Sequence, residues 1–307
     1  MRKIHAGWLA ALVLILGSMY AGGAYVQASG QKAYALNGSD NLDVPYVPTP
    51  ESVVEKMLDM AMVTGDDLVY DLGSGDGRIV ITAAKERGAR GVGIDLDPER
   101  IRESNENARE AQVTDKVQFF QQDLFSVDLS RATVVTLYLL PSVNLELRPK
   151  LFQELMPGTR VVSHDFDMGE WGADQTAEVE GSMVYFWVMP ANVTGTWEWA
   201  MPDQAGGGKC VLEMDQEYQH AAGTLHAGSS ATPLRDVRIS GEMVSFTVDQ
   251  QVNGKTVPMR YEGRVDGSTI EGGIRAPDGS MADGMVWKAS RDPATETAID
   301  EPAAVEM

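Results

Sequence analysis

The run from Val69 to Arg78 constrains the fold of this chain more than any other segment. It reads Val-Tyr-Asp-Leu-Gly-Ser-Gly-Asp-Gly-Arg: an apolar strand reaches an acid at Asp71, a glycine-rich turn follows, and a helix begins at once. This order is typical of the first unit of a Rossmann-like sheet, which binds nucleotide-type ligands at the carboxyl ends of its strands. Glycines let the backbone turn tightly and approach a ligand closely. The turn residues expected to contact the ligand are Gly73, Ser74, Gly75 and Gly77.

The charge of this turn selects the kind of nucleotide. Asp71 and Asp76 would repel the pyrophosphate of a dinucleotide. They would instead attract a ligand that carries an ammonium group and a sulfonium. The sequence therefore predicts S-adenosylmethionine (SAM) as the cofactor, rather than NAD.

Two more predicted strands also end near acids. Residues 90–95 end at Asp95, about twenty residues after the glycines, where a carboxylate accepts hydrogen bonds from the ribose hydroxyls. Residues 117–121 lead into Asp123 and Leu124. An acid at that position can accept a hydrogen bond from the adenine amino group, and the leucine can cover the ring. One such acid alone could be a helix cap, but three in order favour a cofactor site.

These motifs resemble those of class I SAM-dependent methyltransferases. Three further segments carry a narrower likeness: Pro-Tyr-Val-Pro-Thr-Pro at 45–50, Leu-Tyr-Leu-Leu-Pro at 137–141, and Gly-Thr-Arg-Val-Val-Ser-His-Asp-Phe at 158–166. Together they are similar to the small membrane-anchored protein-lysine methyltransferases related to those that modify the mitochondrial ADP/ATP carrier and the ATP synthase c-subunit. The likeness covers roughly residues 44–190.

The resemblance implies an α/β fold with a Rossmann-like, seven-stranded methyltransferase sheet. It also implies SAM as cofactor and a lysine-bearing protein, including membrane proteins, as acceptor. In the related family the segment before the core lies over the SAM site, so Tyr46 and Thr49 are expected cofactor contacts. A linker that only packs on the sheet is the alternative for this segment.

Acceptor groups are expected at the ends of the fourth and fifth strands, beside the cofactor crevice. The catalytic candidates there are Tyr138, His164 and Asp165. Tyr138 could orient a lysine amine, Asp165 could accept a hydrogen bond from its ammonium, and His164 could act as a base. The alternatives are an ordinary buried tyrosine and a histidine bonded to backbone. The fourth strand lacks the Asp/Asn-Pro-Pro-Tyr/Phe element of enzymes that methylate nucleic-acid amines, which disfavours that substrate.

The charge balance also disfavours a nucleic-acid substrate. The formal net charge is -20, whereas a protein that neutralises phosphates usually has a basic face. Six acids follow the fifth strand with no Lys or Arg among them: Asp165, Asp167, Glu170, Asp174, Glu178 and Glu180. A solvated acidic loop is the simplest interpretation. An acidic lip beside the crevice would also attract a cationic lysine.

The first thirty residues are predicted to lie outside the fold. Arg2 and Lys3 precede a long uncharged run, and Val26-Gln27-Ala28 could form a small-residue cleavage site. A signal peptide and an uncleaved membrane anchor fit this segment equally well. Positively charged residues that flank a membrane segment stay on its cytoplasmic side. Both interpretations therefore predict that the catalytic domain is exported, on the periplasmic side or in the cell envelope. That location conflicts with the cytoplasmic supply of SAM.

The remaining chain divides into segments of different pattern. Residues 31–43 are predicted to be a linker, and residues 44–190 are predicted to form the methyltransferase domain. Thr49 is predicted to be the N-cap of the first helix of this domain. A further helix is predicted over residues 144–155, and Pro149 either kinks this helix or marks a later start. Residues 194–291 show alternating strands and Asn-Gly or Asp-Gly turns, which predict about eight antiparallel strands in a meander barrel or sandwich. Residues 292–307 are predicted to be a disordered acidic tail.

No metal site is predicted, because the chain has one cysteine and its four histidines lack metal-ligand spacing. Cys210 is best explained as a packed strand residue.

Three functions remain open from the sequence. The first is a SAM-dependent methyltransferase that N-methylates lysine on a protein acceptor by in-line transfer. The second is a small-molecule or lipid methyltransferase whose β domain shapes the acceptor pocket. The third is a non-catalytic envelope protein that keeps the methyltransferase fold as a scaffold and binds a partner through the β domain. The intact acids at 71, 95 and 123 disfavour the third.

Overall fold

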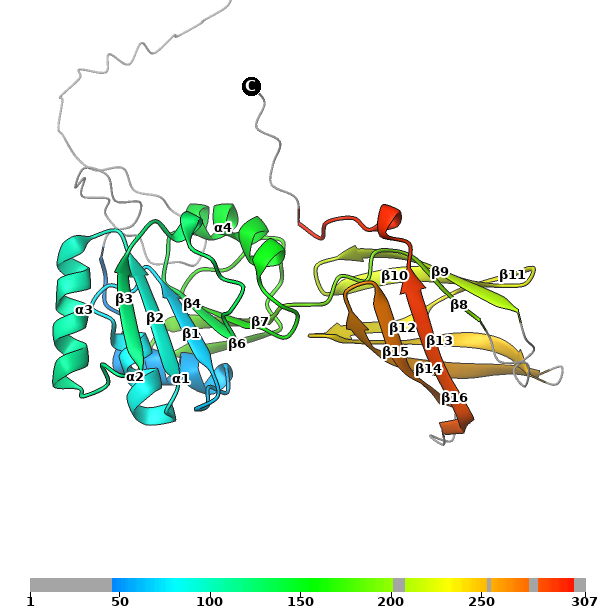
Figure 1. The fold of residues 1–307 in the computed structure, drawn as a ribbon, viewed down its shortest axis with the longest axis horizontal. Helices are drawn as coiled ribbons and strands as arrows, with labels where there is room; N and C mark the ends of the chain where they lie inside the picture. The colour runs from blue at the N-terminus through cyan, green and yellow to red at the C-terminus, as the bar shows by residue number, and fades with distance from the viewer. Residues whose placement is uncertain (1–45, 201–207, 253–254, 276–280, 301–307) are drawn as a thin grey trace, which may run out of the picture. The chain divides into compact units, whose positions relative to one another are not determined.

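The computed structural model describes residues 46–200, 208–252, 255–275 and 281–300 (Figure 1). The predicted leader at 1–30 and linker at 31–43 lie outside these residues. In the part of the chain that is described, no helix is both long enough and apolar enough to cross a membrane.

The first sheet has seven strands in the order β3-β2-β1-β4-β5-β7-β6. Five strands are parallel, and β7 runs antiparallel to both β5 and β6. The strands are β1 (Leu68–Leu72), β2 (Arg90–Asp95), β3 (Val117–Gln121), β4 (Val134–Leu137), β5 (Arg160–His164), β6 (Gln175–Val179) and β7 (Ser182–Val188). The strand order reverses between β1 and β4, and the crevice at such a switch point is where open α/β sheets bind ligands.

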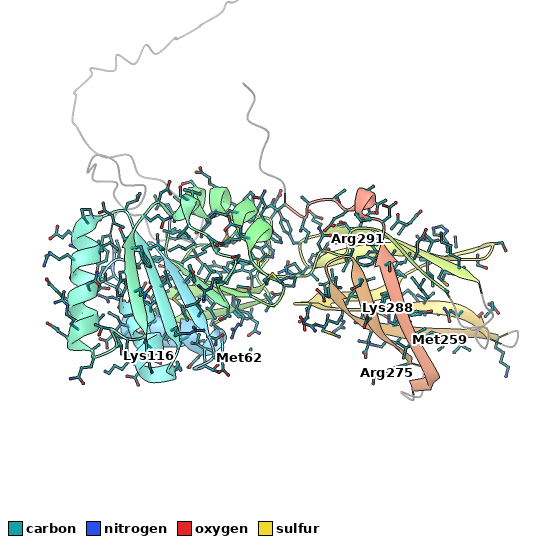
Figure 2. The ribbon with its side chains drawn as sticks, in the orientation of Figure 1. Met62, Lys116, Met259, Arg275, Lys288 and Arg291 are labelled. Carbon is teal, nitrogen blue, oxygen red and sulfur yellow. The ribbon has the colours of Figure 1, made fainter. Side chains whose placement is uncertain are left out.

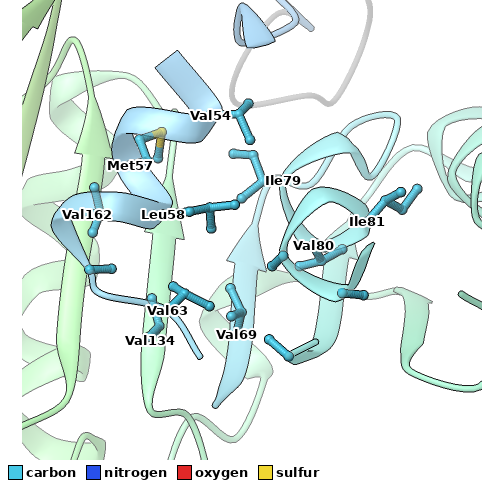
Figure 3. Close-up of a cluster of buried hydrophobic side chains, with 14 of the residues drawn as sticks. Val54, Met57, Leu58, Val63, Val69, Ile79, Val80, Ile81, Val134 and Val162 are labelled. Atoms are coloured by element: carbon cyan, nitrogen blue, oxygen red, sulfur yellow. The ribbon is translucent and has the colours of Figure 1, made fainter. Parts of the chain in front are cut away.

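Helices cover both faces of this sheet, because side chains on successive strand residues point to opposite faces. On one face α1 (Glu51–Met60), α2 (Arg78–Arg87) and α3 (Pro98–Glu110) bury an apolar cluster that includes Met57, Leu58 and Val69 (Figure 3). On the other face α4 (Pro141–Glu154) buries a second cluster. The prediction of a Rossmann-like methyltransferase sheet is therefore confirmed.

Helix α4 differs from its prediction at the start. It begins at Pro141 rather than at residue 144, and it continues through Pro149 to Glu154. Proline is favoured at the first helical position because its missing N–H has no partner there anyway. The interior Pro149 is tolerated where Leu147 and Leu151, both fully buried, hold the helix against the sheet.

The second sheet has nine antiparallel strands in the order β11-β10-β9-β8-β16-β15-β14-β13-β12, and it is nearly barrel-shaped. The strands are β8 (Gly195–Ala200), β9 (Lys209–Glu217), β10 (His220–Ala227), β11 (Ser230–Pro233), β12 (Arg235–Ser240), β13 (Met243–Val252), β14 (Lys255–Asp266), β15 (Thr269–Arg275) and β16 (Met281–Arg291). About eight strands were predicted. The separate all-β domain is confirmed.

Aromatic side chains fill the interior of this sheet. Trp197, Phe246, Tyr261 and Trp287 are all nearly or completely buried, and the rings of Phe246 and Tyr261 stack at 5.0 Å between centroids. Exposure alternates along β16, where Lys288, which is labelled in Figure 2, is exposed next to the buried Trp287. Lys288 pairs with Glu271 of β15. Cys210 is buried in β9, and burial raises the pKa of its thiol.

The segment after β16 is ordered as far as residue 300, which corrects the prediction of a disordered tail for this part. Asp292 caps a short 3-10 helix, η3 (Pro293–Thr295), and Asp300 is buried in an ion pair with Arg148 of α4 at 2.7 Å. The acidic composition suggested disorder, but these acids have partners within the fold. Residues 301–307 lie outside the described residues.

Candidate active site

A pocket lies at the carboxyl ends of β1, β2 and β4, where the sequence predicts a cofactor site. Four segments line it: residues 46–49, the glycine turn with Arg78 and Ile79, residues 94–97 with Arg100, and the β3 and β4 ends at Gln122, Leu124, Tyr138 and Leu139. Of the predicted cofactor residues, the pocket wall contains Tyr46, Thr49, Asp71, Gly73, Ser74, Gly75, Asp95 and Leu124.

Asp71 is the buried acid of this pocket. It is 2% exposed, and Thr136 donates a hydrogen bond to its Oδ1 at 2.7 Å. The pKa of Asp71 is raised from 3.8 to about 7, chiefly by burial; the hydrogen bond from Thr136 opposes the rise, and the charges of Asp95 and Asp76 add to it. A cationic group in the pocket would favour the ionised carboxylate. The pocket therefore fits a ligand that carries an ammonium group.

The Asp95 carboxylate joins the glycine turn after β1 to the turn that follows β2. Its Oδ2 accepts a hydrogen bond from the Gly75 amide at 2.8 Å, and its Oδ1 accepts one from the Asp97 amide at 2.9 Å. Carboxylate oxygens have further lone pairs, so Asp95 can still accept hydrogen bonds from a ligand.

Two predicted cofactor residues lie outside the pocket wall. The Asp123 carboxylate accepts a hydrogen bond from the Phe125 amide at 2.9 Å and caps a short 3-10 helix, η1 (Leu124–Ser126), while its neighbours Gln122 and Leu124 line the pocket. Gly77 precedes α2 with φ +80°, and a Cβ there would lie 2.6 Å from the Phe119 ring. Gly77 is thus required by the turn and by packing.

Residues 46–50, which we call the strap, contribute one wall of the pocket through residues 46–49. A Cβ on Gly75, whose φ is +53°, would lie 2.5 Å from the Tyr46 ring, so only glycine allows this close approach. The Arg100 guanidinium carbon lies 4.6 Å from the centroid of the same ring. Arg78 donates a hydrogen bond to the Thr49 carbonyl at 2.8 Å.

Arg78 and Arg100 were missed by the sequence reasoning. Arg78 is the last residue of the glycine-rich run, and this position is the only sequence feature that could have indicated a role in the site. Thr49 was predicted as the N-cap of α1, which is wrong: Pro50 takes that position without a side-chain cap. The Thr49 hydroxyl is instead buried and lies 3.2 Å from Nδ1 of His164.

The three predicted catalytic residues come together beside the pocket. Tyr138 lines it, and its ring centroid lies 3.8 Å from that of His164. Nε2 of His164 lies 3.5 Å from Oδ2 of Asp165. His164 and Asp165 are 1% and 7% exposed, and neither belongs to the pocket wall. We call these three residues the histidine cluster.

The turn that carries Asp165 is held from two sides. Asp165 has φ +60°, an uncommon conformation for a residue with a side chain. Its backbone donates to the Met183 carbonyl at 2.7 Å, and its Oδ1 accepts from the Met183 amide at 2.8 Å. From α4, the buried Asn144 amide donates to the carbonyls of Phe166 and Asp167 at 3.3 and 3.2 Å. Sequence reasoning missed Asn144, which has no local motif.

The acids after β5 divide into one buried and five exposed residues. Only Asp165 belongs to the histidine cluster. Among the exposed acids, Glu180 accepts a hydrogen bond from Ser52 at the start of α1 at 3.0 Å, and Asp174 accepts one from the Val188 amide at 2.7 Å. The described residues contain no group of three or more ligating side chains that could hold a metal ion.

Comparison with known proteins finds a family model for this part of the chain. A family model described as the ANTKMT methyltransferase domain matches residues 71–175, which include the glycine turn, Asp95 and the histidine cluster.

Curated relatives share much of this sequence. A protein-lysine N-methyltransferase of Saccharolobus islandicus is 51% identical over 151 residues, which are 48% of this chain and 94% of the relative. The lysine N-methyltransferase of Mus musculus that is named for the ATP synthase c-subunit is 34% identical over 62% of this chain and 72% of its own length. The corresponding Xenopus laevis enzyme is 37% identical, and 58% of its length is covered.

Solved structures include an RNA methyltransferase from Salinibacter ruber in complex with S-adenosylhomocysteine. It is 61% identical over 46% of this chain and 93% of that chain, with a TM-score of 0.46.

Proposed function

As a member of the protein-lysine methyltransferase family, this chain is a SAM-dependent methyltransferase, and we propose that it N-methylates lysine on a protein acceptor by in-line transfer. The observation that carries the proposal is the position of the histidine cluster. Tyr138 forms part of the wall of the acid-lined pocket, its ring contacts the buried imidazole of His164, and the Asp165 carboxylate lies beside that imidazole.

The pocket residues fit the two ends of the cofactor. When bound, SAM supplies a methyl group activated by its sulfonium. We assign Asp71 to the ammonium of the cofactor and Asp95 to the ribose hydroxyls. The placement of Asp123 as a cap gives no support to its predicted contact with adenine, and Leu124 and Gln122 are better placed beside the ring.

The histidine cluster supplies what a lysine acceptor needs. A lysine amine must lose its proton before it can attack a methyl group, because only the neutral amine has a free electron pair. Asp165 accepts a hydrogen bond from the incoming ammonium, His164 takes its proton, and Tyr138 orients the amine. Positioning of this kind contributes about 7–11 kcal/mol when the reacting atoms are about 3–3.5 Å apart.

The proposal extends to the kind of acceptor and to the location of the enzyme. The curated relatives include enzymes named for the ATP synthase c-subunit and for adenine nucleotide translocase. We propose a membrane-associated protein acceptor and an exported or membrane-anchored enzyme, which the uncharged run near the N-terminus supports.

Transfer of a labelled methyl group tests the proposal. The purified chain is incubated with tritiated SAM and four fractions of its native cells: membranes, soluble protein, lipid extract and RNA. We expect label in protein, at lysine by mass spectrometry, and no label with an Asp71→Asn variant. Label confined to lipid, small molecules or RNA would contradict the lysine proposal. No transfer and no heat of SAM binding would favour a scaffold without catalytic activity.

A further inference from the structure

The strap takes part in two sites at once. Its residues Tyr46 to Thr49 line the cofactor pocket, while the Thr49 side chain reaches the histidine cluster. Three elements hold this short segment: the start of α2 through Arg78, α3 through Arg100, and the end of β5 through His164. A segment held in this way can transmit the state of one site to the other.

Arg78 is the strongest of these ties. Its guanidinium is oriented by Asp76, which it meets at 2.6 Å and at 2.9 Å through two nitrogens, so the remaining Nη1 is directed at the Thr49 carbonyl. An arginine held on one side by a carboxylate presents its other donors in a fixed geometry. Asp76 and Arg78 also line the pocket, so the tie lies where the cofactor is enclosed.

The bond between Thr49 and His164 selects the form of the imidazole. If the threonine hydroxyl donates to Nδ1, then Nε2 carries the proton and faces Asp165. If Nδ1 donates to the hydroxyl, Nε2 is left as a base. The titratable groups that face this ring include Tyr138, which follows β4, and Asp165, which follows β5.

We propose that Arg78 and Thr49 are positioning residues that couple closure of the strap over the cofactor to orientation of the His164 imidazole. The histidine cluster is then complete only when the strap is in place, and the strap is in place when Arg78 holds the Thr49 carbonyl. This inference rests on the proposed function for its catalytic part, but the tie to Arg78 can be measured without catalysis.

Paired variants of the full chain separate the two ties. Arg78→Ala should weaken S-adenosylhomocysteine binding about tenfold by calorimetry, the effect of one lost charge-assisted hydrogen bond, and Arg78→Lys should recover part of it. Thr49→Val should leave that affinity within about threefold, but it should lower kcat about tenfold and shift the pH profile of kcat. Thr49→Ser, which keeps the hydroxyl, should restore both.

The nitrogen chemical shifts of His164 give a readout that does not need activity. In labelled protein, Thr49→Val should change the tautomer of this ring while Thr49→Ser keeps it, and Arg78→Ala should change it as well, because the two sites are coupled through the strap. An unchanged affinity or an unchanged His164 tautomer in Arg78→Ala, or an unchanged tautomer and pH profile in Thr49→Val, would overturn the proposal. If the wild-type chain methylates no protein, the proposed function fails, while the calorimetry and the nitrogen shifts still decide whether the coupling exists.

Discussion

The cofactor pocket and the histidine cluster are neighbours that are built in different ways. The pocket is made from local turns at successive strand ends, and its acids follow the strands in chain order. The cluster depends on contacts between distant segments, such as Thr49 with His164 and Asn144 with the turn at 166–167. A local sequence motif therefore predicts the pocket, whereas the contacts of the histidine cluster are seen only when the folded chain brings distant segments together.

The largest effect is expected in the histidine cluster. His164→Ala should lower kcat about 10²–10⁴-fold, because it removes the proposed base, while the affinity for S-adenosylhomocysteine changes little. His226, which is partly exposed on β10, offers a matched control, and His226→Ala should leave both quantities unchanged. An equal loss of cofactor affinity in His164→Ala would show that the two regions are not separable.

The pocket should respond in the opposite way. Asp95→Ala should weaken cofactor affinity by ~1–3 kcal/mol, because it leaves the Gly75 and Asp97 amides and the ribose hydroxyls without their acceptor. Titration calorimetry with S-adenosylhomocysteine measures this loss, and saturating SAM should restore most of kcat. Unchanged affinity would mean that the ribose site has been misplaced.

The pH dependence of stability tests the pocket without any acceptor. Asp71 has a folded pKa of about 7 against an ordinary value of 3.8, so the folded state binds more protons than the unfolded state between these values. Its contribution to stability is full below pH 3.8 and is lost as pH rises to about 7, by at most about 1.4 kcal/mol per pH unit. Denaturant unfolding of the ligand-free protein should show this slope, and Asp71→Asn should flatten it. A steeper slope in the variant would contradict the assignment.

The smallest effect should come from the support of the cluster. Asn144→Ala removes the amide that donates to the Phe166 and Asp167 carbonyls, which should cost about 0.5–1.5 kcal/mol of stability. We expect a modest fall in kcat with no change in cofactor affinity, measured by steady-state kinetics and calorimetry. If cofactor affinity falls as much as kcat, then Asn144 supports the whole edge of the sheet rather than this turn.

This contrast explains how much of the molecule could be predicted from its sequence. The sheet, the SAM dependence and the separate β domain followed from spacing, because glycine turns and strand-end acids are local features. Residues 71 and 95 could be named for the same reason, and residues 138, 164 and 165 because they stand at the ends of the predicted fourth and fifth strands. Their roles as site residues stay predictions.

The features that could not be predicted depend on tertiary contacts. Thr49 has the sequence context of a helix cap, and only its burial against His164 gives it another role. Asp123 has the context of a ligand contact but caps a short helix. Asp300 lies in an acidic stretch that reads as disordered, yet it pairs with Arg148, 152 positions earlier. Sequence patterns do not encode partners at such distances.

The raised pKa of Asp71 also links ligand binding in the pocket to the release of protons. Because the pKa of Asp71 is raised to about 7, part of the free molecules carry a proton on this carboxyl near neutral pH. A ligand that requires the charged carboxylate must displace that proton, so its binding releases protons into the medium. The heat of binding should therefore vary with the ionisation enthalpy of the buffer, and capture of the cofactor should weaken as the medium acidifies.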